Sequence, residues 1–190
     1  MLEQREGRGE FVVTDTPSPN ESSAATRIEV DTNLQPVALP GPVINELCAH
    51  AIDARPEECC GLVTGANDQR FRDVHRCRNE MTARHRADSV AYPRDGREAY
   101  LMNEIDYLQA QEHAEGKGDE VTAVYHSHVG AGVYFSEMDQ EFADAAFFPF
   151  PGAAQIVLAV WEGRVAGAGM FTRDAQSGLF VGVGVELRDA

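Results

Sequence analysis

The feature that most constrains the fold is a pair of histidines two residues apart, His126 and His128, with Ser136 and Asp139 following at fixed spacing. Side chains on a β-strand alternate between its two faces, so a strand that contains both histidines points both imidazoles to one side. A serine three residues before an acidic residue is typical of a helix start. If the carboxylate closes a cluster with the two imidazoles, the end of a strand and the start of a helix must face each other.

Imidazole and carboxylate groups suit zinc, whereas the all-oxygen ligand set expected for calcium or magnesium is missing here. Three protein ligands leave one coordination position open, as in catalytic rather than structural zinc sites. We therefore predict one zinc ion per chain, bound by His126, His128 and Asp139. Each part of the pattern also has a simpler interpretation. An H-x-H pair alone is unspecific, and Ser136 with Asp139 forms a helix cap whether or not a metal binds.

A hydrolytic zinc site also needs a general base that is not itself a ligand. The segment P-E-E-C-C-G at residues 56–61 offers two candidates, Glu57 and Glu58, between a predicted helix and a predicted strand. Glutamates in such a position are more often solvated surface groups than catalytic ones, because Glu is almost always exposed. The residues by themselves leave both candidates open.

Apolar periodicity predicts the remaining elements. Helical spacing covers residues 43–54, 103–115 and 136–147, with Asn103 as an N-cap of the second helix. Strand patterns cover residues 60–64, 70–77, 120–127, 155–161, 165–172 and 179–187. Residues 79–99 and 129–135 are expected to be irregular. This order predicts an α/β or α+β fold in which a mixed central β-sheet is flanked by helices.

The first 37 residues differ from the rest of the chain. They are polar and interrupted by Gly, Pro, Ser and Thr, so they bury too little apolar surface to offset the entropy of ordering. We expect residues 1–37 to be a disordered or loosely attached arm and residues 38–190 to form one domain. Within the arm, only residues 11–13 and 27–30 are apolar enough to add an edge strand or to dock on a partner.

Composition limits the classes of partner and compartment. The formal net charge of −15 makes nucleic acid an unlikely partner, because an acidic chain repels phosphate. The four cysteines form no C-x-x-C pair, so we expect them to be reduced and the protein to be cytoplasmic. We expect no membrane partner, since no apolar run is long enough to span a bilayer and no secretory signal begins the chain. A monomer and a homodimer both stay open.

Taken together, the motifs resemble a known family. H-x-H-x7-S-x-x-D, preceded by P-x-E-x-C-G, is similar to the signature of the JAMM (MPN-plus) zinc metallopeptidases. The resemblance also includes Asn79 and the apolar strands at 123–128 and 155–160, and it covers about residues 40–187. In size the chain resembles the short bacterial and archaeal members. The resemblance implies the JAMM/MPN (cytidine deaminase-like) fold.

The resemblance also implies roles for particular residues. Glu58 is the general base and acid, Ser136 hydrogen-bonds the developing oxyanion or the bound water, and the zinc ligands are the three named above. Members of the family hydrolyse isopeptide or peptide bonds after the C-terminal glycines of ubiquitin-like or sulfur-carrier proteins. The chain departs from many relatives in lacking a proline after His128. Its loop at 129–135 ends in Tyr134 and Phe135, which would either contact a substrate tail or belong to the core.

Two other functions remain to be weighed. A non-catalytic scaffold of the same fold would bind partner proteins, but such a protein would be expected to lack the metal ligands that this chain keeps. A zinc nucleobase deaminase would show H-x-E followed by P-C-x-x-C. The chain has no P-C-x-x-C segment, so this combination is absent and the deaminase is set aside.

Overall fold

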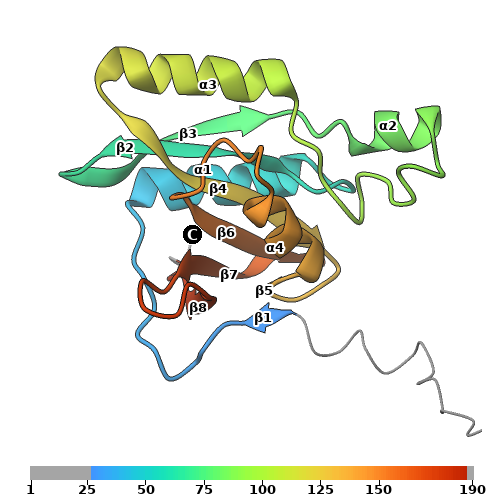
Figure 1. The fold of residues 1–190 in the computed structure, drawn as a ribbon. Helices are drawn as coiled ribbons and strands as arrows, with labels where there is room; N and C mark the ends of the chain where they lie inside the picture. The colour runs from blue at the N-terminus through green and yellow to red at the C-terminus, as the bar shows by residue number, and fades with distance from the viewer. Residues whose placement is uncertain (1–26, 188–190) are drawn as a thin grey trace, which may run out of the picture.

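The computed structural model describes residues 27–187 and is built around one mixed six-stranded sheet (Figure 1). The strand order is β3-β2-β4-β6-β7-β8, and only the β4–β6 pair is parallel. The strands are β2 (Cys60–Ala66), β3 (Gln69–Cys77), β4 (Glu120–Val129), β6 (Ala154–Trp161), β7 (Arg164–Arg173) and β8 (Phe180–Gly184). The predicted mixed sheet flanked by helices is confirmed, and every strand expected from apolar patterning is present.

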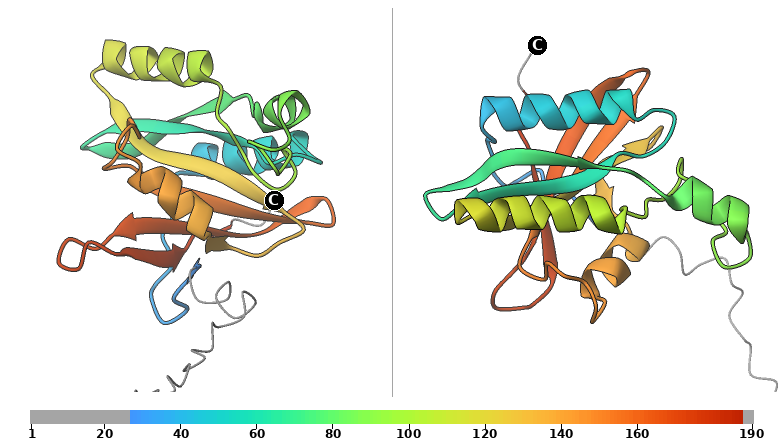
Figure 2. Two further views of the ribbon diagram at one scale, coloured as in Figure 1. Left: turned by 45° about the vertical axis from the view of Figure 1, so that its right-hand side comes forward. Right: turned by 90° about the horizontal axis from the view of Figure 1, so that it is seen from above.

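Helices cover both faces of the sheet. Figure 2 shows α1 (Gly41–Asp53) and α3 (Glu104–Lys117) on opposite sides of β2 and β3. The apolar side chains of α1 pack on one face of the sheet, whereas Ala110 of α3 and Ala143 of α4 (Glu137–Asp144) join clusters on the other face. Residues alternate between these faces along β4, so His126 and His128 follow Val124 on the face that α3 and α4 cover.

The predicted cap of α3 is confirmed. The side chain of Asn103 accepts a hydrogen bond from the amide of Asp106, and the helix ends at Gly118 in a left-handed conformation. Asn103 also accepts a hydrogen bond from Arg78, which follows β3. The cap therefore fixes the start of α3 against the end of the neighbouring strand.

The sequence predicted that residues 79–99 are irregular throughout. This prediction was wrong in part, because Met81–Ala87 forms the helix α2. None of its residues is buried, so apolar periodicity gives no signal for it. The loop expected at 129–135 is also shorter than predicted. β4 continues through Val129, and Tyr134–Phe135 forms the short strand β5.

Part of the predicted N-terminal arm is paired with the domain. Ile28–Glu29 forms β1, which pairs antiparallel with β5, and Val30 and Val37 form bridges to Gly182 and Val185. Ile28 and Val30 pack against the aromatic cluster around Phe135, and this burial of apolar surface offsets the entropy lost when the segment becomes ordered. Residues 27–37 are thus part of the fold, and the rest of the predicted arm, residues 1–26, lies outside the described residues.

Two further expectations concern the whole described chain. All four cysteines are free, as predicted. Among residues 27–187, no helix combines the length and the apolar character needed to cross a membrane.

Gly61 in β2 is required by close packing, so Gly61→Ala should strongly destabilise the protein. A Cβ at this position would lie 2.2 Å from the carbonyl oxygen of His75 and 2.6 Å from the ring of Tyr125. Both neighbours belong to the core sheet, so we expect a loss of about 3 kcal/mol in the free energy of unfolding, at the upper end of overpacking costs. Urea unfolding measures the loss.

Gly116 in α3 is the matched control for this prediction. A Cβ there meets nothing within 4 Å, so Gly116→Ala should be neutral or stabilise by about 0.5–1 kcal/mol. Equal effects of the two substitutions would contradict the packing argument.

Candidate metal centre

Three potential metal ligands from two elements converge, as the sequence predicted. His126 and His128 come from the end of β4, and Asp139 comes from the first turn of α4. The two histidine Nε2 atoms lie 3.2 Å apart, and Oδ2 of Asp139 lies 3.5 Å from the first and 3.8 Å from the second. All three side chains are buried. The strand end and the helix start therefore meet as the predicted cluster required.

The separations of these atoms fit a zinc ion. Tetrahedral ligands at zinc distances of about 2.0–2.1 Å lie about 3.3 Å from one another, close to the values observed. Nδ1 of His128 donates to the carbonyl oxygen of Gly132 at 3.1 Å. A carbonyl can only accept, so this bond places the proton on Nδ1 and leaves the Nε2 lone pair free for a metal. The donor set and its outer contact both suit zinc.

Ser136 and Asp139 form a reciprocal capping box at the start of α4. The amide and the hydroxyl of Ser136 donate to Oδ2 of Asp139 at 2.9 and 2.6 Å, and the amide of Asp139 donates back to the hydroxyl oxygen at 3.1 Å. The cap thus holds the same oxygen that faces the histidines. Burial alone would raise the pKa of Asp139, but His126, His128 and the Ser136 hydroxyl outweigh it and hold the pKa well below its usual range.

Glu58 lies in the same cavity as two of the three candidate ligands, His128 and Asp139. Its residue is 6% exposed, and it lines a cavity of about 340 Å³ together with His128, Ser136 and Asp139. Burial, followed by the negative charge of Asp139, raises the pKa of the Glu58 carboxyl to about 9, against a smaller opposing effect of Arg94. With this pKa the carboxyl keeps its proton at neutral pH in the metal-free protein. The positive charge of a metal ion at the neighbouring candidate ligands would lower the pKa, as a general base requires.

Glu57, the other candidate base, has a different environment. Its carboxylate accepts a hydrogen bond from the hydroxyl of Thr82 at 2.7 Å, and Glu57 does not line the cavity that Glu58 shares with His128 and Asp139. The two glutamates that the residue pattern left open are therefore distinguished by the structure, and Glu58 is the one beside the metal ligands.

Asn79 fixes the backbone around Glu58. Its side-chain amide donates to the carbonyl oxygens of Glu58 and Ala99, both at 3.1 Å, and its side-chain oxygen accepts from the amide of Leu101 at 3.0 Å. The sequence marked Asn79 only through the family resemblance, and the structure shows the physical reason for an amide here. It ties the start of β2 to the segment that leads into α3.

Sequence reasoning missed two groups that shape the site. Ser127, between the histidines, accepts a hydrogen bond from the amide of Cys59 and so aligns the residue next to Glu58 with β4. Tyr100 stacks on His126 from the segment before α3. The alternation of side chains along a strand predicts that Ser127 points to the face opposite the two histidines. No local pattern marks Tyr100, because its contact joins distant parts of the chain.

The loop that departs from the family pattern is part of the site. Gly130 has a φ of 75°, a conformation that favours glycine, and it turns the chain so that Gly132 reaches His128. The two aromatic residues at its end have different roles. Phe135 is fully buried and packs with Phe171, whereas Tyr134 contacts His128 and lines the cavity.

Fold and site together define an α+β domain with a buried three-ligand candidate site for a single metal ion. The profile of the prokaryotic homologues of the JAB domain matches residues 40–172, and the chain belongs to this family. This match confirms the resemblance to the short prokaryotic members of the family that the sequence motifs indicated.

Solved structures agree with the fold. A solution structure of a protein from Desulfitobacterium hafniense is 21% identical with a TM-score of 0.54, and it aligns over 80% of this chain and 93% of its own. Another from Salinibacter ruber is 25% identical with a TM-score of 0.53, over 80% of this chain and 92% of its own. A search of curated proteins found no match.

Replacement of one ligand tests the metal site directly. Asp139→Asn keeps the size of the side chain and an oxygen for the helix cap, but a neutral amide is a poor zinc ligand. We expect the affinity for zinc to fall by about 100-fold or more, since changes even in outer contacts cost 10–100-fold. Competition with a chromophoric chelator measures it. Glu141→Gln, in the same helix, is the control, and equal losses in the two variants would argue against the assigned ligands.

Proposed function

We propose that this protein is a zinc-dependent peptidase. Its substrate would be an isopeptide or peptide bond that follows the C-terminal Gly-Gly of a ubiquitin-like or sulfur-carrier protein. The observation that carries the proposal is the position of Glu58. It is buried in one cavity with His128 and Asp139, two members of a convergent set of three groups that suits zinc. Membership of the JAB family supports the same chemistry.

The chain's own residues account for the proton transfers of such a reaction. A zinc ion at this site would polarise the scissile carbonyl and lower the pKa of water to about 7. Glu58 accepts the proton of the attacking water and then delivers it to the leaving amine. The Ser136 hydroxyl, which borders the cavity, is placed to donate to the oxygen that becomes negative, after release from Asp139.

A second cavity adjoins the site cavity and supports the proposal of an extended substrate tail. The site cavity shares Arg94, Tyr134, Ser136 and Met138 with a neighbouring cavity of about 650 Å³. Three of these four side chains are large, so a tail that ends in glycines meets the least interference where it passes them. This arrangement favours a small-residue terminus over a bulky one.

Cleavage of defined fusions tests the proposal. The zinc-loaded protein is incubated with small ubiquitin-like or sulfur-carrier proteins fused through Gly-Gly to a reporter peptide, and the products are identified by mass spectrometry. We expect a cut directly after Gly-Gly and none in fusions that carry Val-Val instead. A zinc-to-protein ratio near zero and no cleavage of any fusion would favour the non-catalytic scaffold.

A further inference from the structure

Two tyrosines lie against the rings of the two histidines. Tyr100 is stacked on His126 with ring centroids 4.7 Å apart and an interplanar angle of 24°. Tyr134 lies against His128 at 4.5 Å and 44°. Neither tyrosine belongs to the converging ligand set, and they come from different segments: Tyr100 from the segment before α3, and Tyr134 from β5. Each imidazole therefore has one tyrosine ring packed against it.

The two histidines differ in their outer hydrogen bonds. Nδ1 of His128 donates to Gly132, which fixes the orientation of that ring. Nδ1 of His126 is buried and has no hydrogen-bond partner among residues 27–187. Metal-binding histidines are usually oriented by a hydrogen bond from the second ring nitrogen, and His126 lacks this bond. Among the described residues, packing contacts are what remain to orient its ring.

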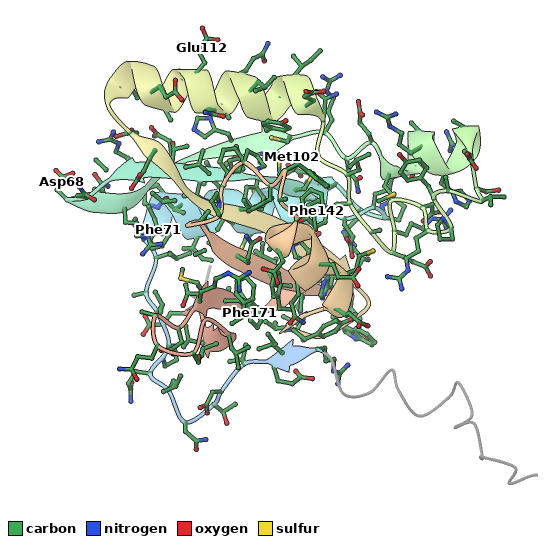
Figure 3. All side chains as sticks on the ribbon, viewed as in Figure 1. Asp68, Phe71, Met102, Glu112, Phe142 and Phe171 are labelled. Atoms are coloured by element: carbon green, nitrogen blue, oxygen red, sulfur yellow. The ribbon has the colours of Figure 1, made fainter. Side chains whose placement is uncertain are left out.

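Tyr100 supplies such a contact and is itself held in place. Its other contacts include an edge-on approach to Phe142 of α4, with centroids 6.2 Å apart. Phe142 and Met102, both labelled in Figure 3, belong to one apolar cluster between α3 and α4. Because α4 also carries Asp139, the packing of Tyr100 links two of the three ligands. Offset aromatic contacts of this kind contribute about 0.5–1.5 kcal/mol beyond burial.

We propose that Tyr100 is a positioning residue for the metal centre: its ring orients the His126 imidazole in place of the usual outer hydrogen bond. The inference rests on the metal site of the proposed function but not on the peptidase activity. Tyr134 has a smaller role of the same kind, because the Gly132 hydrogen bond already orients His128.

Zinc affinity of the full chain tests the proposal, measured by chelator competition on Tyr100→Leu, Tyr100→Phe and Tyr134→Leu. We expect Tyr100→Leu to bind zinc about 10-fold or more weakly, within the range for lost outer contacts. Tyr100→Phe, which keeps the ring, should stay within about threefold of wild type, and Tyr134→Leu should lose less than Tyr100→Leu. Tyr107→Leu is the control, since Tyr107 packs on Phe150 in the apolar cluster.

A spectroscopic reading separates positioning from general destabilisation. With Co²⁺ as the probe, Tyr100→Leu should change the visible absorption spectrum, whereas Tyr107→Leu should reproduce that of wild type. If Tyr100→Leu does not fold, Phe142→Leu is the second variant. This substitution removes the edge-on contact of Phe142 with Tyr100. It should weaken zinc binding by about threefold, with a normal fold by circular dichroism.

Two results would overturn the proposal: affinity within threefold of wild type in Tyr100→Leu, or an unchanged affinity and Co²⁺ spectrum in Phe142→Leu where the first variant fails to fold. A different result would contradict the proposed peptidase function. In that case zinc binding still depends on Tyr100, but no Gly-Gly fusion is cut.

Discussion

Glu58→Gln should abolish cleavage while zinc binding remains. Glu58 lies in the cavity with His128 and Asp139 but is not one of the three converging groups, so the amide leaves the metal site intact. A glutamine has the same shape as glutamate but cannot take up the water proton. The rate of cleavage should fall by about 10²–10⁴-fold, the usual contribution of a general base. Mass spectrometry of the Gly-Gly fusions measures the rate, and elemental analysis measures the zinc.

The neighbouring glutamate supplies a matched control. Glu57→Gln makes the same chemical change one residue earlier, on a carboxylate that accepts a hydrogen bond from Thr82 outside the cavity. Its rate should stay within a few fold of wild type. A Glu58→Gln protein that still cleaves at a comparable rate would exclude Glu58 as the base, and a loss of zinc in that variant would make it a ligand instead.

The parts of the site that follow from local patterns could be predicted from sequence. The spacing of His126 and His128 fixes a common strand face, and the Ser136–Asp139 pair fixes a helix start. The order of strands and helices around them then brings the strand end and the helix start together. The main strands and helices were predictable for the same reason, since each buries a regularly spaced apolar face.

Features that depend on distant contacts could not be predicted in this way. The helix α2 buries none of its residues, and β1 has only two residues, so neither carries a periodic signal. The stacking of Tyr100 on His126 joins positions 26 residues apart without any motif. Apart from the family resemblance, no pattern around Glu58 predicts its burial, because most glutamates are exposed. Tertiary packing alone makes this residue exceptional.

In the metal-free protein, Glu58→Gln should be more stable than wild type, by an amount that grows as the pH rises. The pKa of the Glu58 carboxyl is raised from 4.5 to about 9, first by burial and then by the charge of Asp139. Between these values the folded protein keeps a proton that the unfolded chain releases. Folding then requires proton uptake, so wild-type stability falls with rising pH over this window. Glutamine does not ionise and escapes this loss.

The size of the effect makes it measurable by thermal and urea unfolding in the presence of a chelator. Each pKa unit corresponds to about 1.4 kcal/mol, so even half of the shift gives Glu58→Gln an advantage of about 3 kcal/mol near pH 9. Near pH 4.5 the two proteins should have similar stability. A difference that stays constant from pH 5 to 9 would show that Glu58 is ionised in the folded protein throughout. Its carboxylate would then be solvated, and burial would no longer explain how a glutamate at this position holds and returns a proton.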